Sequence, residues 1–185
     1  MKLLLLALLL LLPSSLTAQD RESKIKTFRN NKRFSVKYDK FKDQTFVKVG
    51  PFVVGGDMRY AITGKQLYMS AGFLHRGVTL DEPIKDFMIY FEATGKDWQF
   101  LKSRELYAIA DGERFDFGEG RYDGDVRGGF QGVGVSESLG FLVTAEAFKK
   151  LGTARKVEFR IGTFEMTLKD EHKEAFRDLL TLTKN

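Results

Sequence analysis

The chain has 185 residues, of which 43% are apolar and 30% are charged, and its formal net charge is +5. This composition is typical of a folded globular protein, and the length fits one domain of about 100–200 residues. There are no cysteines, which excludes disulfides, thiol nucleophiles, thiolate zinc sites and iron–sulfur clusters. Only two histidines, His75 and His172, could serve acid–base or metal chemistry.

Residues 1–18 have the pattern of a secretory signal peptide. Lys2 precedes an apolar run of ten residues, 3–12, and small residues lead up to Ala18. Ten helical residues rise about 15 Å, half of a bilayer core of about 30 Å, so we predict no transmembrane span in the mature chain. We expect cleavage near Ala18 and a periplasmic or secreted protein. The lack of disulfides and of Asn-x-Ser/Thr sites favours a bacterial envelope.

The positive charge is concentrated near the start of the chain that would remain. Residues 19–48 contain ten Lys or Arg against four Asp or Glu, whereas residues 49–185 contain 19 against 21. From residue 19 to 33 there is no hydrophobic period, so we predict a basic, mobile lead-in. We predict that residues 34–185 form a single globular β-rich domain.

The first half of this domain reads as strands. Apolar residues alternate with polar ones over 34–38 and again over 67–73, which predicts half-buried strands. The run 46–54 is interrupted by Gly50-Pro51, which indicates an edge strand or a bulge. Residues 87–91 are apolar on both alternating faces, so we expect a central strand that is covered on both sides.

The middle of the chain is rich in turn signals. We expect residues 98–101 and 106–110 to continue the antiparallel meander, with a hairpin turn at Asp111-Gly112. Residues 118–134 contain seven glycines, and we predict a loop or an irregular ribbon there.

The last third predicts two helices and a hairpin. Thr144 can cap a short helix near 145–151 that Gly152 would end. Two alternating strands around Gly162-Thr163 predict a hairpin in which Ile161 and Phe164 are opposite each other. An apolar stripe predicts a C-terminal helix near 170–182. The fold class expected is therefore α+β, mainly β, with an antiparallel sheet or a sandwich.

Candidate catalytic residues are few. His75 follows an apolar strand and could carry a proton, and the carboxylates of Asp116, Glu119 and Asp123 could complete the site of a small extracytoplasmic hydrolase. The alternative for His75 is a strand-end histidine with a satisfied hydrogen bond. We expect His172 to be solvent-exposed in the first turn of the last helix.

The acidic stretch 111–125 is also a candidate calcium site. Asp111, Asp116, Asp123 and Asp125 offer hard oxygen ligands next to a glycine-rich backbone, and such a site would make the domain a calcium-stabilised module. The order of residues matches neither an EF-hand nor a nonapeptide calcium repeat. The alternative is a solvated hairpin, and we predict no metal or other cofactor.

Basic and aromatic residues alternate at the beginning of the domain. Such a pattern binds anionic partners, or it forms a solvated tail and strand edge. We expect an anionic envelope component or another envelope protein as the partner, and no nucleic acid. Trp98 could stack on a ligand or anchor the edge of the core. The candidate binding residues are Arg29, Arg33, Lys37, Lys40, Lys42 and Trp98.

The expected function follows from these patterns. We predict an exported envelope domain that acts as a non-catalytic binding or structural accessory protein. The hydrolase and the calcium-stabilised module remain the alternatives.

Overall fold

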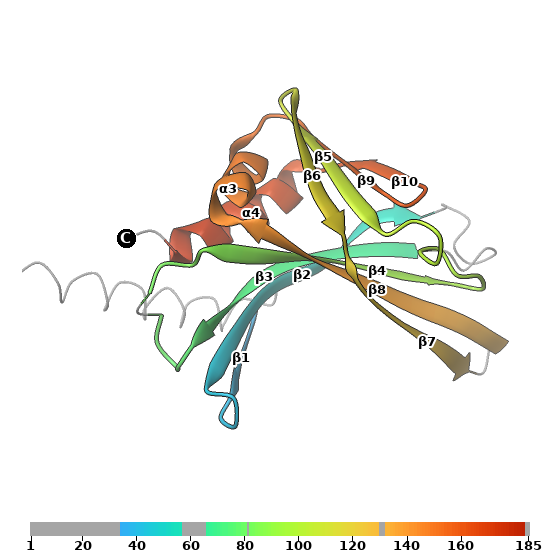
Figure 1. The fold of residues 1–185 in the computed structure, drawn as a ribbon, viewed down its shortest axis with the longest axis horizontal. Coiled ribbons are helices and arrows are strands. Elements are labelled where there is room, and N and C mark those ends of the chain that lie inside the picture. Colours follow the sequence, from blue (N-terminus) through green and yellow to red (C-terminus); the bar gives the residue numbers. More distant parts are fainter. Residues whose placement is uncertain (1–33, 57–65, 81, 130–131, 184–185) are drawn as a thin grey trace, which may run out of the picture.

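Two antiparallel sheets and two helices make up the part of the chain that the structure describes (Figure 1). The structure is a computed structural model, and it describes residues 34–56, 66–80, 82–129 and 132–183. Sheet A contains, in spatial order, β1 (Phe34–Asp39), β2 (Gln44–Gly56), β3 (Gln66–Arg76), β4 (Asp86–Gly95), β8 (Gly132–Thr144) and β7 (Arg121–Gly129). Sheet B contains β10 (Phe164–Thr167), β9 (Val157–Ile161), β5 (Glu105–Ala110) and β6 (Glu113–Glu119).

The helices and sheet B lie on the same side of sheet A (Figure 1). Helices α3 (Ala145–Thr153) and α4 (Asp170–Leu182) pack against each other; α3 contacts β4 and β8, and α4 contacts β2. From sheet B, strand β10 contacts β2 and strand β6 contacts β8. The odd-numbered side chains of β3 and β4 are buried beneath this layer.

Stacked aromatic rings connect the layers of the core. The Phe87 ring of β4 stacks on Phe148 of α3 at 4.1 Å between centroids, and Phe148 lies 4.7 Å from Phe176 of α4. Phe91 of β4 meets Phe159 of β9 edge to face at 5.9 Å. Each layer therefore buries its apolar side against the others, which makes one domain with one core.

The α+β, mainly β fold class is confirmed, as are several local predictions. The Thr144 hydroxyl accepts a hydrogen bond from the Ala147 N–H and caps α3. Ile161 and Phe164 are paired across the β9–β10 turn. Asp111 and Gly112 form the β5–β6 turn, where both have positive φ, as a type I′ turn requires.

The prediction of a loop or an irregular ribbon over residues 118–134 was wrong. Most of this segment forms β7 and the start of β8, which pair from Arg121–Gly140 to Gly129–Gly132. A strand ladder needs only backbone groups, so glycines can take part in it. Some glycines are also required: a Cβ at Gly120 would lie 2.6 Å from the Phe141 ring.

Strand β2 is not an edge strand, because β1 and β3 flank it on both sides. The alternative prediction, a bulge, is confirmed by the shift in register between Val49 and Phe52. The bulge removes Pro51, which has no N–H to donate, from the ladder.

Three smaller predictions also need correction. Residues 98–101 form no strand, with bends at 99–101, and β5 belongs to sheet B instead of continuing the sheet A meander. Gly152 does not end α3 but lies within it, and a Cβ there would be 3.2 Å from Leu180 of α4. Strand β4 is central, but only its Phe87 face is fully buried, and Met88 and Tyr90 on the other face are half-buried.

Candidate functional site

The β1–β2 turn projects from the side of the molecule opposite the β5–β6 turn (Figure 1). It connects paired residues Asp39 and Gln44 by a four-residue loop. The Asp39 carboxylate accepts hydrogen bonds from the Phe41 N–H at 2.9 Å and the Lys42 N–H at 3.3 Å. Such a side-chain bond to the backbone two residues ahead fixes the loop conformation. The turn therefore presents its side chains from a defined backbone.

A large apolar ring is at the apex of this turn. Phe41 is 89% exposed, and it lies between the exposed Lys40 and Lys42. The Lys40 ammonium lies 5.1 Å from the centre of the Phe41 ring. Lys37 is exposed two residues before Asp39, on β1. The turn and the adjoining end of β1 thus combine an exposed aromatic ring with three lysines.

The end of β3 adds two more residues to this surface. The Gly77 N–H donates to the Asp43 carbonyl at 2.9 Å, which places the segment after β3 beside the turn. Arg76 extends into solvent there with a 91% exposed side chain, and Val78 is 52% exposed. We refer to the following residues as the basic tip: Lys37, Lys40, Phe41, Lys42, Arg76 and Val78.

The acidic residues of the turn are engaged within it. Asp43 accepts a hydrogen bond from the Tyr38 hydroxyl at 3.1 Å and pairs with Arg76 at 3.4 Å. This hydrogen bond, together with partial desolvation and the charges of Asp43 and Asp39, raises the pKa of Tyr38 above its usual range. Tyr38 therefore stays a neutral donor at neutral pH. The Asp39 carboxylate holds the backbone of the turn, and the Asp43 carboxylate holds the Tyr38 and Arg76 side chains. The exposed Lys37, Lys40 and Lys42 therefore make the apex positive.

His75 borders a hollow of 500 Å³ beside the basic tip. Its Nδ1 lies 3.0 Å from the Arg76 carbonyl, which can only accept, so Nδ1 carries the proton. Nε2 is buried and has no hydrogen-bond partner within the described residues. Glu82 and Asp86 also line the hollow.

The carboxylates proposed to act with His75 are on other strands. Asp123 of β7 pairs with Ser138, which is level with Glu92 and then with Tyr68 of β3. Tyr68 precedes His75 by seven residues, so Asp123 and His75 are separated by about 20 Å along the strands, beyond hydrogen-bond reach.

Asp116 and Glu119 are both on β6. Asp116 accepts the Gly118 N–H at 2.9 Å, and Glu119 lies 4.0 Å from Arg104. Asp125 follows Asp123 on the same face of β7. No group of three or more His, Cys, Asp and Glu in the described ranges could hold a metal ion.

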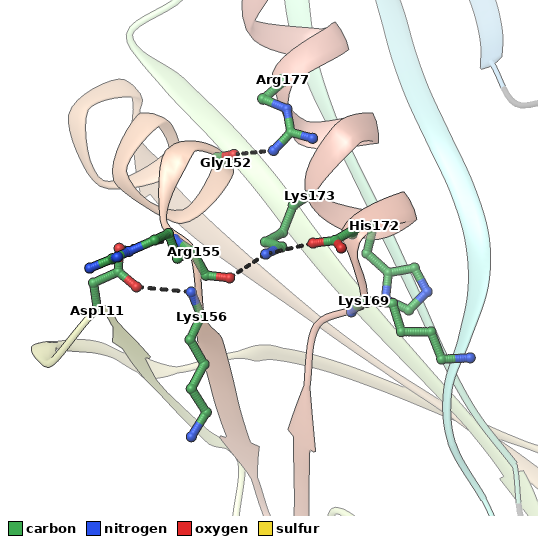
Figure 2. Close-up of polar contacts among 9 residues, drawn as sticks. Asp111, Gly152, Arg155, Lys156, Lys169, His172, Lys173 and Arg177 are labelled. Carbon is green, nitrogen blue, oxygen red and sulfur yellow. Dashed lines mark hydrogen bonds and ion pairs between the residues drawn. The ribbon is translucent and has the colours of Figure 1, made fainter.

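Asp111 has a structural role (Figure 2). Its carboxylate accepts the N–H groups of Arg155 and Lys156, each at 2.9 Å, and so connects the β5–β6 turn to the start of β9. These two hydrogen bonds lower the pKa of Asp111. Lys173 of α4 donates to the Arg155 carbonyl and pairs with Asp170 at 2.9 Å. Both carboxylate oxygens of Asp111 therefore already accept a backbone hydrogen bond.

His172 is buried, so the prediction of exposure was wrong. Only 3% of it is exposed, and its ring packs against Phe52 of β2 at 5.2 Å between centroids. Its Nδ1 accepts the Lys169 N–H at 3.3 Å at the start of α4. Burial is the largest cause that lowers the pKa of His172. The neutral ring therefore acts as a cap and a packing group.

Sequence reasoning missed a buried carboxylate, Glu137 of β8. It is 1% exposed, and it accepts hydrogen bonds from the Gln99 N–H, the Phe100 N–H and the Tyr122 hydroxyl. These donors come from the bend after β4 and from β7, so Glu137 fixes the segment that contains Trp98. Glu137 is two residues from the buried Val135 and two from the buried Leu139, which places it on the inner face of β8 and is the only signal in the sequence.

A second hollow, of 660 Å³, lies over sheet B. Its lining includes Tyr107, and the Arg160 guanidinium lies 4.9 Å from the centre of that ring. Arg160 is paired across the strands with Glu165, and Ile109 with both Arg114 and Glu158. This surface alternates charge in sign, as a solvated sheet face does.

The structure brings together three of the candidate binding residues, Lys37, Lys40 and Lys42. Trp98 follows the end of β4 that pairs with Gln66, remote from Arg76. Arg29 and Arg33, with the predicted signal peptide and basic lead-in, are outside the described residues. Among the helices that the structure describes, none is long and apolar enough to cross a membrane.

Comparisons of the chain with protein families, with curated proteins and with solved structures gave no match.

Proposed function

We propose that this chain is an exported protein of the bacterial envelope, without catalytic activity, that binds an anionic envelope component through the basic tip. The exposed Phe41 between Lys40 and Lys42 is the observation that carries the proposal. An aromatic ring at the apex of a turn that Asp39 fixes contributes little to the core. Its position favours contact with another molecule.

The distribution of charge supports the same role. The basic tip draws most of its residues from the segment 19–48, whose net charge of +6 contrasts with −2 over residues 49–185. Each Lys or Arg near an anionic surface contributes about 1 kcal/mol to binding. Three neighbouring lysines therefore give a useful, salt-sensitive attraction.

Export is tested by producing the full chain in a bacterial host and measuring its intact mass in each cell fraction. We expect the envelope fraction to hold a chain that lacks about 18 residues, consistent with cleavage near Ala18. Recovery of the unprocessed chain from the soluble cytosol would contradict this part of the proposal.

Binding is tested by co-sedimentation of the processed protein with isolated bacterial envelopes at low and high salt. We expect the double variant Lys40→Glu, Lys42→Glu to bind at least about tenfold more weakly at low salt. The matched control is Lys102→Glu, Lys149→Glu, which changes the net charge equally at exposed positions away from the tip. Equal losses in the two double variants would show that net charge, and not the basic tip, controls binding.

A further inference from the structure

We infer that the basic tip binds an anionic lipid bilayer, with the Phe41 ring inserted at the boundary between headgroups and acyl chains. This inference rests on the proposed function, because it names the component that the tip binds. The strength of peripheral binding to a membrane increases with apolar insertion and with electrostatic attraction to anionic lipids. The turn provides both within three consecutive residues, Lys40, Phe41 and Lys42.

The shape of the tip favours a bilayer over a protein partner. A stable protein interface buries about 800 Å² on each side around a packed apolar centre. Within the basic tip the apolar groups are the Phe41 ring and Val78, 89% and 52% exposed. A bilayer needs only a side chain that reaches past the headgroups, and it adapts to the rest of the surface.

The combination of residues also favours lipid over an acidic polymer. A polymer would interact with the lysines through charge alone, and Phe41 would remain in water. At a bilayer the Phe41 ring leaves water, while the long stems of Lys40 and Lys42 allow their ammonium groups to stay among the phosphates. The Lys40 ammonium lies over the Phe41 ring, at 5.1 Å from its centre, so the charge and the ring are presented together.

Backbone order makes insertion of the ring more favourable. The Asp39 carboxylate holds the Phe41 and Lys42 N–H groups, so the turn has little conformational entropy to lose on binding. The Gly77 N–H also joins the segment with Arg76 and Val78 to the turn through the Asp43 carbonyl. The hollow next to the tip has two acidic lining residues, Glu82 and Asp86, and two basic ones, Arg76 and Lys85. The excess of positive charge therefore lies on the turn and not in the hollow.

The test uses the processed protein and vesicles of phosphatidylglycerol with phosphatidylcholine, with acyl chains either plain or brominated. Trp98 is the only tryptophan, and it follows the far end of β4, about 30 Å along the strands from Arg76. It therefore reports no insertion in the wild type. The substitution Phe41→Trp adds a reporter at the apex, both with Trp98 kept and together with Trp98→Phe.

We expect brominated chains to quench the fluorescence that Phe41→Trp adds, and to leave Trp98 unquenched. We expect Phe41→Ser to weaken binding to anionic vesicles about tenfold or more, because the variant has no aromatic ring to bury in the bilayer. The control Val133→Ser removes a 72% exposed side chain near the β7–β8 turn and should bind as the wild type does. Phe41 is exposed, so melting curves of the variants should match that of the wild type.

A third arm measures binding to dextran sulfate, an acidic polymer. Binding to the polymer in a Lys40- and Lys42-dependent way, with no binding to vesicles, would overturn the bilayer inference and leave the proposed function standing. The inference would also be overturned if Phe41→Ser bound vesicles as tightly as the wild type, or if brominated chains left the indole added by Phe41→Trp unquenched. If the wild-type protein bound neither the anionic vesicles nor dextran sulfate, the proposed function would be overturned as well.

Discussion

At the scale of single residues, the buried carboxylate of Glu137 has the largest effect on stability that we predict. Its oxygens accept two backbone N–H groups and the Tyr122 hydroxyl. In Glu137→Gln an amide NH2 would replace one oxygen and face an N–H, so a buried donor would lose its acceptor. We expect a loss of about 3 kcal/mol in the free energy of unfolding, measured by urea denaturation.

The control for this change is Glu146→Gln on α3, where the side chain is 82% exposed and pairs with Lys150 at 3.6 Å. A surface pair of this kind contributes about 0–1 kcal/mol. A similar, small loss in both variants would mean that Glu137 does not hold the bend containing Trp98.

The lowered pKa of His172 predicts that the free energy of unfolding depends on pH. Burial lowers its pKa below the ordinary value of 6.5, Lys169 acts in the same direction, and Glu171 opposes them. The unfolded chain therefore takes up the proton first as the pH falls, so stability is present above pH 6.5 and declines below it until the folded ring is protonated.

The comparison of wild type with His172→Asn isolates this effect. Asn keeps an acceptor for the Lys169 N–H but does not titrate. We expect the difference in free energy of unfolding between the two proteins to shrink as the pH falls from about 7.5 to about 5.5. A difference that stays constant over this range would show that His172 is protonated equally in both states.

At the scale of elements, the glycine-rich hairpin depends on close contacts at some of its glycines. A Cβ at Gly120 would lie 2.6 Å from the Cζ of Phe141, which the core holds in place. A Cβ at Gly128 has no atom within 4 Å. We expect Gly120→Ala to cost about 1–3 kcal/mol and Gly128→Ala to be neutral or slightly stabilising, as thermal melts would show. Equal melting temperatures for the two variants would contradict this account.

These contacts explain why some elements could be predicted from the sequence and others could not. Strands β1, β3 and β9 could be predicted because they alternate in polarity along their own length. Strand β7 could not, since Gly120 just before it and Gly124 within it leave room for the rings of Phe141 and Trp98, which come from other segments. Three of the nine residues of β7 are glycines, and they interrupt the side-chain periodicity that would otherwise predict a strand.

The same distinction applies to the sites. Lys37, Lys40 and Lys42 could be chosen from the sequence because they are neighbours along the chain. Arg76 and Val78 join them only through the hydrogen bond between Gly77 and Asp43. Burial of His172 depends on Phe52, which lies far away in the sequence. Contacts that close such long loops leave no local pattern.

At the scale of the whole molecule, the shared aromatic core makes the two sheets one cooperative unit. Phe148 stacks on Phe87 of sheet A and on Phe176 of α4, and Phe91 connects sheet A to Phe159 of sheet B. We expect Phe148→Leu to lower the protection of amides in β4 and in β9 by the same free energy, measured by hydrogen exchange with mass spectrometry. We also expect Trp98 fluorescence and far-UV circular dichroism to give one superimposable denaturation curve.

The control is Leu142→Ala, which changes an exposed residue on the uncovered face of β8. It should change the protection free energy of the amides in β4 and in β9 by no more than about 0.5 kcal/mol. If the amides of β9 lost protection while those of β4 kept it, the sheets would unfold separately.

A cooperative core has a consequence for the basic tip. Strand β2, which supports the turn, pairs with β3 and contacts α4 and β10, so the position of Phe41 depends on the same global stability as the core. Variants of the tip can therefore be compared at equal stability, because exposed changes at Phe41 leave the supporting core intact.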